Sequence, residues 1–146
     1  MLDEDQKQSL IAAARRAAER AYAPYSGFPV GAAVLTIDGA VITAGNVENA
    51  SYGLTICAER SAISAAVAAG HRQVRAIAVV APKALGTTPC GACRQVLNEF
   101  VPADGEMTIL LDGEEGIDQI SLSELLPRSF GPRTLERVTT QTNADQ

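Results

Sequence analysis

Two short, almost entirely apolar stretches constrain the fold of this chain more than any other feature of its sequence. Residues 76–80 read Ala-Ile-Ala-Val-Val, and residues 107–111 read Met-Thr-Ile-Leu-Leu. A strand with one face in water alternates apolar and polar side chains, whereas a strand covered on both faces does not. Both stretches therefore predict buried strands, and helices are expected to cover the sheet that contains them.

Helical and strand patterns alternate along the rest of the chain. Helices are predicted from Asp3 to just before Pro24, over 57–69 and 90–100, and, as a short element, over 121–126. Strands over 30–37 and 41–44 flank Asp38-Gly39, a dipeptide typical of hairpin turns. This order of elements indicates one α/β domain in which helices cover a mixed sheet.

The length and charge of the chain narrow its class. A chain of 146 residues suits a single domain, which we predict to cover 1–138, and the polar residues 139–146 are predicted to form a disordered tail. Twelve Lys and Arg against seventeen Asp and Glu give a net charge of −5, the wrong sign for binding nucleic acid through its phosphates. The N-terminus is acidic, unlike a secretory signal, and no apolar run approaches the roughly 18 residues of a membrane span. We therefore expect a cytoplasmic protein that binds neither nucleic acid nor a membrane.

The three cysteines, Cys57, Cys90 and Cys93, are the strongest indication of chemistry. Their odd number and their spacing do not suit a disulfide framework, which leaves metal binding or catalysis. Cys90 and Cys93 are three residues apart after a proline, so on a first helical turn both sulfurs can reach one zinc ion. A thioredoxin-like redox pair has the same spacing and is the alternative for these two residues alone.

Cys57 and Glu59 favour the zinc site over the redox pair. Together with the later cysteines they form Cys-x-Glu followed by Pro-Cys-x-x-Cys, a pattern typical of zinc-dependent base deaminases, in which cysteine can replace the usual histidine ligand. A carboxylate such as that of Glu59 can take a proton from water and return it to a leaving amine. Residues two apart point in different directions on a helix, so this role requires Cys57 to lie at the helix cap.

A fourth protein ligand for zinc is hard to find. The single histidine, His71, follows Cys57 across a predicted helix, roughly 20 Å away, so we predict a surface histidine and a water molecule as the fourth ligand. Three thiolates on one zinc leave a net charge of about −1. The helix N-termini at Cys57 and Cys90 and the Arg60 guanidinium would compensate for it, with Arg94 as a weaker candidate.

Six segments of the chain, together, are specific for one enzyme family. They are Ala-Tyr-Ala-Pro-Tyr-Ser at 21–26, Phe-Pro-Val-Gly-Ala-Ala at 28–33, Asn-Val-Glu-Asn-Ala-Ser-Tyr at 46–52, Cys-Ala-Glu-Arg at 57–60, Pro-Cys-Gly-Ala-Cys-Arg-Gln-Val at 89–96, and Leu-Leu-Pro at 125–127 followed by Phe130. Through them the chain resembles the small, homotetrameric zinc cytidine deaminases of pyrimidine salvage. The resemblance implies a three-layer α/β/α fold, hydrolytic deamination of cytidine and deoxycytidine, and one Zn²⁺ per subunit.

The resemblance also implies a role for each matching residue. Zinc would be held by Cys57, Cys90 and Cys93, and Glu59 would be the acid and base. The substrate would be a small pyrimidine nucleoside, bound by Phe28 stacked on the base, by the backbone of Ala58, and by Asn46 and Glu48 on the sugar hydroxyls. Three residues, Ala50, Tyr52 and Phe130, would reach the site of a neighbouring subunit in a homotetramer with shared active sites. Without the family, Phe28 would be assigned to the core, and for Phe130 the alternative is packing into the core of its own chain.

Three other functions stay open at this point. A deaminase for another aminated pyrimidine or a nucleoside antibiotic, such as a blasticidin S deaminase, shares the zinc motif. A polynucleotide-editing deaminase needs contacts to flanking phosphates, for which this chain offers only two lysines, Lys7 and Lys83. A structural zinc module without catalysis needs a fourth protein ligand. An assay with cytidine separates all three from a cytidine deaminase.

Overall fold

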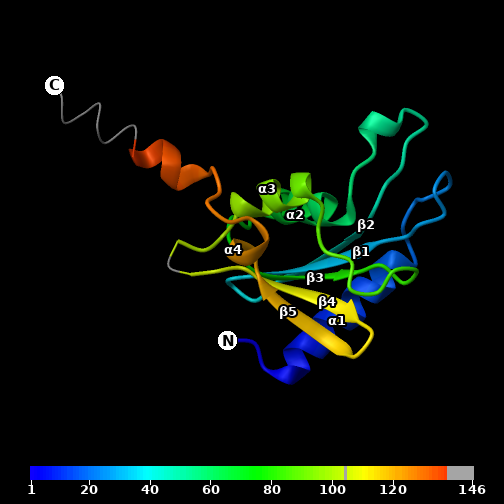
Figure 1. The fold of residues 1–146 in the computed structure, drawn as a ribbon, viewed down its shortest axis with the longest axis horizontal. Coiled ribbons are helices and arrows are strands. Elements are labelled where there is room, and N and C mark those ends of the chain that lie inside the picture. The colour runs from blue at the N-terminus through cyan, green and yellow to red at the C-terminus, as the bar shows by residue number, and fades with distance from the viewer. Residues whose placement is uncertain (104, 138–146) are drawn as a thin grey trace.

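The computed structural model describes residues 1–103 and 105–137 as one α/β domain (Figure 1). Its elements are, in chain order, α1 Glu4–Ala18, β1 Gly31–Thr36, β2 Val41–Gly45, the 3₁₀ helix η1 Tyr52–Leu54, α2 Ala58–Ala68, β3 Val74–Val80, α3 Gly91–Asn98, β4 Thr108–Gly113, β5 Gly116–Ser121 and α4 Leu122–Leu125. A further helical stretch covers 132–137. None of the helices in the described residues is both long and apolar enough to cross a lipid bilayer.

The five strands form one mixed sheet in the order β2-β1-β3-β4-β5. The central pair β3 and β4 is parallel, and every other neighbouring pair is antiparallel. The β1–β2 hairpin turns at Asp38-Gly39, where Gly39 has a φ of 91°, a conformation that glycine adopts without steric cost. The predicted hairpin and mixed sheet are therefore confirmed.

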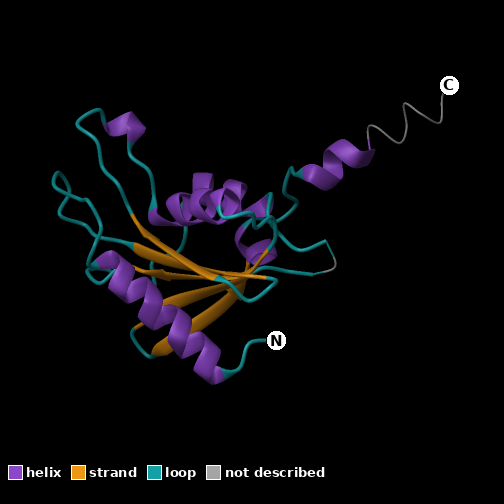
Figure 2. Cartoon of the chain, turned by 180° about the vertical axis from the view of Figure 1, so that it is seen from behind, coloured by secondary structure: helices purple, strands orange, loops and turns teal. Residues whose placement is uncertain are grey.

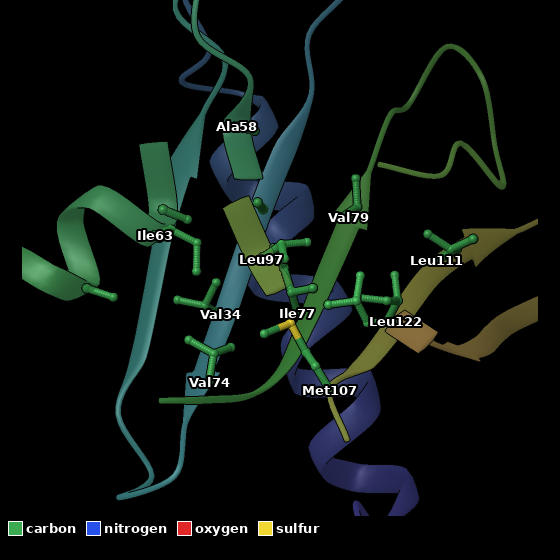
Figure 3. Close-up of a cluster of buried hydrophobic side chains, with 14 residues drawn as sticks. Val34, Ala58, Ile63, Val74, Ile77, Val79, Leu97, Met107, Leu111 and Leu122 are labelled. Atoms are coloured by element: carbon green, nitrogen blue, oxygen red, sulfur yellow. The ribbon is translucent and has the colours of Figure 1, made fainter. Parts of the chain in front are cut away.

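Helices cover both faces of this sheet, as Figure 2 shows. On β3 the side chains of Ala76, Ala78 and Val80 pack toward α1, whereas Ile77 and Val79 lie in the core under α2 and α3. Figure 3 shows this second core, in which Ile77 and Leu97 lie close together. Burial on both faces is the physical reason that residues 76–80 contain no polar position. The three-layer α/β/α fold is confirmed.

Small residues allow α1 to approach the sheet closely. A Cβ added at Gly31 would lie 1.9 Å from the backbone oxygen of Ala14, so a larger residue at the start of β1 would push the helix away. The capping box at the helix start is formed as predicted, because the Asp3 side chain accepts a hydrogen bond from the Gln6 backbone N–H and the Gln6 side chain accepts one from the Asp3 backbone N–H. The helix ends at Ala18, however, six residues before Pro24, because the following segment turns to pair with the chain at Val47.

The largest departure from the predicted order is β5, which the sequence pattern did not indicate. It pairs antiparallel with β4 at the edge of the sheet, and most of its side chains are exposed or only half-buried. Such a strand lacks the apolar run that revealed β3 and β4. The short helix after it is confirmed as α4, with Ser121 and Glu124 forming the capping box. Residues 139–146, predicted to be a disordered tail, lie outside the described residues, and the domain boundary at 138 stays a prediction.

Candidate active site

Two helix starts meet on one side of the sheet. Cys57 is the N-cap of α2, Cys90 is the N-cap of α3, and Cys93 lies in the first turn of α3. The two helices contact each other above the same face of the sheet (Figure 1). Neither N-cap cysteine uses its side chain to cap its helix, so both sulfurs are free to point toward the metal position. The chain therefore delivers three sulfurs to one place from residues far apart in sequence.

The sulfur positions fit a zinc ion. The Cys57 and Cys90 Sγ atoms are 3.9 Å apart, those of Cys90 and Cys93 are 3.5 Å apart, and all three lie within 4.8 Å of one another. Tetrahedral zinc with Zn–S bonds of about 2.3 Å holds its sulfurs about 3.8 Å apart. Among the described residues this cluster has three members and no fourth His, Cys, Asp or Glu. Such a site leaves one coordination position for water or substrate.

Arg60 supplies positive charge next to the thiolates. Its Nη2 donates to the Cys57 sulfur at 3.5 Å from one turn further along α2. Hydrogen bonds from the Cys93 thiol and the Arg60 guanidinium lower the pKa of Cys57. The Nε atom of Arg60 is buried without a hydrogen-bond partner among the described residues. The guanidinium of Arg60 therefore lies beside the Cys57 sulfur, and its role in compensating the thiolate charge stays a prediction.

Glu59 is one of few buried charged residues in the described part of the chain, with 5% of its surface exposed. Because Cys57 is the N-cap and not a helical residue, Glu59 can lie beside the cysteine cluster, and its carboxylate interacts with the Cys57 and Cys93 side chains. Burial raises the pKa of Glu59 above the ordinary value of a glutamic acid. A raised pKa brings the carboxyl group closer to the range in which it both accepts and donates protons near neutral pH.

His71 and Arg94 lie away from the sulfurs. His71 follows the far end of α2, whose eleven residues span roughly 16 Å, and its Nδ1 is 3.1 Å from an Asp38 carboxylate oxygen in the β1–β2 turn. Arg94 donates instead to the Pro89 and Leu125 carbonyl oxygens, at 2.7 and 2.9 Å. None of these acceptors is a cysteine sulfur, and the suggestion that Arg94 helps to compensate the zinc charge stays a prediction; its guanidinium joins the turn before Cys90 to the end of α4.

The predicted sugar-binding residues, Asn46 and Glu48, both contact the segment around Phe28, which we call the rim of the site. The Asn46 side chain is buried, accepts from the Val30 amide at 2.9 Å and donates to the Phe28 carbonyl oxygen at 3.0 Å. One Glu48 oxygen accepts from the Tyr25 and Ser26 amides at 2.9 and 3.1 Å, and hydrogen bonds from Ser26 lower the pKa of Glu48. Both side chains therefore hold the segment around Phe28, which the sequence pattern did not reveal, and each keeps hydrogen-bonding capacity for a ligand.

An open cavity of about 320 Å³ lies at this rim. Its lining residues are Tyr25, Ser26, Glu48, Asn49, Tyr52 and Thr55, and the cysteines are not among them. Phe28 itself is half-buried, so it is not a core residue of the usual kind, and Ala58 is fully buried at the start of α2.

The three residues expected to act on a neighbouring chain are all exposed. Ala50 lies on the loop before η1, Tyr52 is 75% exposed, and Phe130 is 61% exposed beyond α4. The Tyr52 ring contacts the Tyr25 ring of its own chain, with the centroids 5.9 Å apart. Phe130 does not pack into the core of its own chain, which removes that alternative. In the single chain these residues and the cysteine cluster are separate features.

Comparison with known proteins places this site in a family. The model of the family described as the cytidine and deoxycytidylate deaminase zinc-binding region matches residues 4–107. This chain belongs to that family. Among curated relatives, the cytidine deaminase of Halalkalibacterium halodurans is 54% identical over 125 residues, which cover 85% of this chain and 93% of that protein. The cytidine deaminase of Mycobacterium tuberculosis is 44% identical over 124 residues, with coverages of 85% and 89%.

Solved structures agree with this family assignment. A 1.6 Å crystal structure of cytidine deaminase from Burkholderia pseudomallei is similar to this chain with a TM-score of 0.77 at 48% identity, covering 84% of this chain and 98% of that chain. A crystal structure of cytidine deaminase from Mycobacterium tuberculosis has a TM-score of 0.74 at 43% identity, with coverages of 85% and 96%. The zinc-binding region of the family and the sulfur geometry agree, and the chain offers one zinc site per subunit.

Two polar residues of this deaminase-family chain were not singled out from the sequence. Gln95 and Asn98, on α3, both donate to the backbone carbonyl of Phe130, at 3.0 and 3.1 Å. Their spacing of three places them on one helix face, which is a weak signal because any exposed polar pair shows it. The partner they share lies more than thirty residues later, and only the fold reveals it.

Proposed function

We propose that this protein is a zinc-dependent cytidine deaminase that hydrolyses cytidine and deoxycytidine to uridine and deoxyuridine with release of ammonia. The observation that carries the proposal is the cluster of three cysteine sulfurs at zinc-coordinating distances, with the buried carboxyl group of Glu59 beside it. A structural zinc site has four protein ligands and no need for a buried acid at its edge. A site with three ligands and a proton carrier is suited to hydrolysis.

The residues of the chain divide the reaction between them. Cys57, Cys90 and Cys93 hold zinc, which when bound supplies the Lewis acidity that makes a water molecule nucleophilic at neutral pH. Glu59 would accept the two protons of the attacking water one after the other, passing one to the ring nitrogen and one to the departing amino group, which leaves as ammonia. Arg60 offsets the negative charge of the thiolates through its hydrogen bond to Cys57.

The rim residues recognise the nucleoside. Phe28 stacks on the pyrimidine and the backbone at Ala58 contacts it, while Asn46 and Glu48 bind the sugar hydroxyls. The support for this arrangement is that the Asn46 amide and the Glu48 carboxylate already lie on either side of the Phe28 segment and keep free hydrogen-bonding positions. A cavity of about 320 Å³ at this rim is large enough for part of a small nucleoside.

Four such chains form a homotetramer with shared active sites, in which Ala50, Tyr52 and Phe130 reach neighbouring subunits. Exposure supports this assembly, because four of the six aromatic residues of the chain, Tyr52 and Phe130 among them, are exposed in the isolated subunit. The enzyme acts in the cytoplasm in pyrimidine salvage. Three cysteines required as thiolate ligands favour a reducing compartment of that kind.

Incubation of the purified protein with cytidine and deoxycytidine tests the proposed reaction. We expect the ultraviolet spectrum to change to that of the uracil nucleoside with release of one ammonia per nucleoside, and Glu59→Gln to abolish both signals. The same assay with blasticidin S and with single-stranded DNA containing cytosine covers the alternative deaminases. A zinc-loaded protein that leaves both nucleosides unchanged would overturn the proposal.

A mixing experiment tests the shared sites. Phe130→Ala and Glu59→Gln are co-expressed with different tags, and mixed oligomers are isolated on both tags in succession. In random mixtures about one quarter of the sites combine an intact Glu59 with an intact Phe130 of another chain, so activity returns. Mixed oligomers without recovered activity, when Phe130→Ala alone is impaired, would show that each site is completed within one chain.

A further inference from the structure

Two side chains of α3 form hydrogen bonds with the segment that follows α4. Gln95 Nε2 and Asn98 Nδ2 both donate to the carbonyl oxygen of Phe130, and Ser129 Oγ donates to Asn98 Oδ1 at 3.2 Å. Both ends of the Asn98 amide are therefore used on two adjacent residues of this segment. These contacts join parts of the chain that are more than thirty residues apart.

Tight packing shows that this segment is seated on the helix. A Cβ added at Gly131 would lie 2.5 Å from Asn98 Nδ2, so the backbone there approaches as closely as a glycine allows. Arg128 has a φ of 53°, an unusual conformation for a residue other than glycine, and it turns the chain toward α3. The backbone at 129–131 is held while the ring of Phe130 remains 61% exposed.

The same helix carries two of the three cysteines. Cys90 and Cys93 lie at the start of α3, and Asn98 is its last residue, five residues beyond Cys93. The exposed ring is therefore mounted on the scaffold that fixes the metal centre of its own chain. A ring fixed in this way loses less conformational entropy when it enters a partner's site than a ring on a free tail does.

We propose that Gln95 and Asn98 are positioning residues, which hold the backbone of Phe130 so that its ring enters the active site of a neighbouring subunit. This inference rests on the proposed function, because it takes the ring to act on a partner's substrate. The two amides do not touch the nucleoside. They act through the Phe130 carbonyl, and each contributes a hydrogen bond that the exposed segment would otherwise make to water.

Steady-state kinetics give the first test. Asn98→Ala and Gln95→Ala are expected to lower kcat/KM for cytidine roughly 3- to 10-fold, mainly through KM. Asn98→Asp has nearly the same shape and keeps the acceptor for Ser129, yet lacks the donor to Phe130, so it should resemble Asn98→Ala. Glu99→Ala, one position further along and without contact to 129–131 among the hydrogen bonds of the described residues, is the matched control and should equal the parent.

Combination with Phe130→Ala sharpens this test. If Asn98 acts only through the ring, adding Asn98→Ala to Phe130→Ala costs little more than Phe130→Ala alone. Fully additive losses would show that Asn98 supports α3 in another way and would overturn the proposal.

Mixed oligomers separate positioning from damage to the metal centre. In a mixture of Asn98→Ala with Glu59→Gln chains, sites that combine an intact Glu59 with a correctly held Phe130 from the other chain regain activity. A mixture of Asn98→Ala with Phe130→Ala chains has no correctly placed ring and stays impaired. If Asn98→Ala instead disturbed Cys90 and Cys93 of its own helix, the first mixture would not recover, which would overturn the proposal.

A fluorescence measurement reads the same contact without relying on activity. The chain contains no tryptophan, so Phe130→Trp introduces a single indole at the tip of this segment. We expect Asn98→Ala to lower the fluorescence anisotropy of that indole, and Glu99→Ala to leave it unchanged. Equal anisotropy in Phe130→Trp alone and in its combinations with Asn98→Ala and Glu99→Ala would overturn the proposal that Asn98 positions Phe130. If the protein shows this anisotropy difference but does not deaminate cytidine, the proposed function is overturned, whereas the contact between Asn98 and Phe130 is supported.

Discussion

The centre and the rim of the site are built in opposite ways. At the centre, Cys93 and Glu59 are buried, and the cysteines are fixed by the first turns of two packed helices. At the rim, Tyr52 is largely exposed and lines a cavity that is open to solvent, and Phe130, beyond α4, is exposed as well. The residues proposed for the chemistry therefore lie together in one chain, whereas two of the residues proposed to enclose the substrate are exposed in the single chain.

The difference follows from what each region must do. A zinc site needs ligands held within a few tenths of an ångström, which helix caps above a packed core supply. A rim must admit a nucleoside and release the product, so exposed rings on loops suit it better than rings buried in a core. The comparison predicts that substitutions at the centre act within their own chain and abolish catalysis, whereas substitutions at the rim weaken substrate binding.

The largest effect is expected from Cys93→Ala. Removing a buried thiolate ligand should lower zinc content and deaminase activity together, to below one hundredth of the parent activity. Metal analysis and the cytidine assay on the same sample check this result. His71→Ala is the matched control and should change neither. Loss of zinc in the His71 variant would mean that the histidine is a ligand and that the site is closed.

Glu59→Gln should lose about 10²- to 10⁴-fold in kcat, because an amide cannot carry the proton that hydrolysis requires. Zinc content should stay at the parent level, since Glu59 is not part of the sulfur cluster. Stopped assays at high enzyme concentration, together with metal analysis, measure both quantities. Activity within a factor of a few of the parent in a zinc-loaded variant would remove Glu59 from the mechanism.

Arg60→Gln tests the charge balance of the centre. The variant should retain most of its zinc and lose roughly 10- to 100-fold in activity, the usual cost of losing a hydrogen-bond partner of a metal ligand. Without the guanidinium beside Cys57, the thiolates are less well compensated, so ionisation of the zinc-bound water should require a higher pH. The acidic limb of the pH–rate profile should therefore move upward. An unchanged profile would assign Arg60 a purely structural role.

The rim offers a matched pair with smaller effects. Glu48→Ala should lower kcat/KM for cytidine about tenfold, mostly by raising KM, through loss of a charged hydrogen bond to the sugar. Asn46→Ala should do the same and also reduce the free energy of unfolding by about 1–3 kcal/mol, because it leaves the Phe28 and Val30 backbone groups unpaired. Denaturant unfolding separates the two variants. Equal stability losses would contradict the different burial of the two side chains.

Much of the fold was predictable from local signals. Because β3 is buried on both faces, its residues 76–80 form an uninterrupted apolar run. The helix caps at Asp3 and Ser121 involve residues only three positions apart, so the sequence alone indicates them. β5 was not predictable in the same way, because an exposed edge strand is stabilised by pairing with β4 and not by its own pattern.

The centre of the site was more predictable than its rim for a related reason. Cysteines and a glutamate at fixed spacing on two helix starts constrain each other strongly, and the structure brings the three sulfurs together. The hydrogen bonds from Asn98 to Phe130 and from Arg94 to Leu125 join residues that are more than thirty positions apart in the sequence. Residue types as common as Asn and Arg carry no spacing signal for such contacts.

Titration of the metal-free protein with zinc tests the central claim most directly. Chelation should abolish cytidine deamination, and added Zn²⁺ should restore it linearly up to one equivalent per chain, with no further gain beyond that point. A break at one equivalent is the result expected for a single site made by Cys57, Cys90 and Cys93. Full activity after verified removal of the metal, or restoration that is unrelated to one zinc per chain, would contradict it.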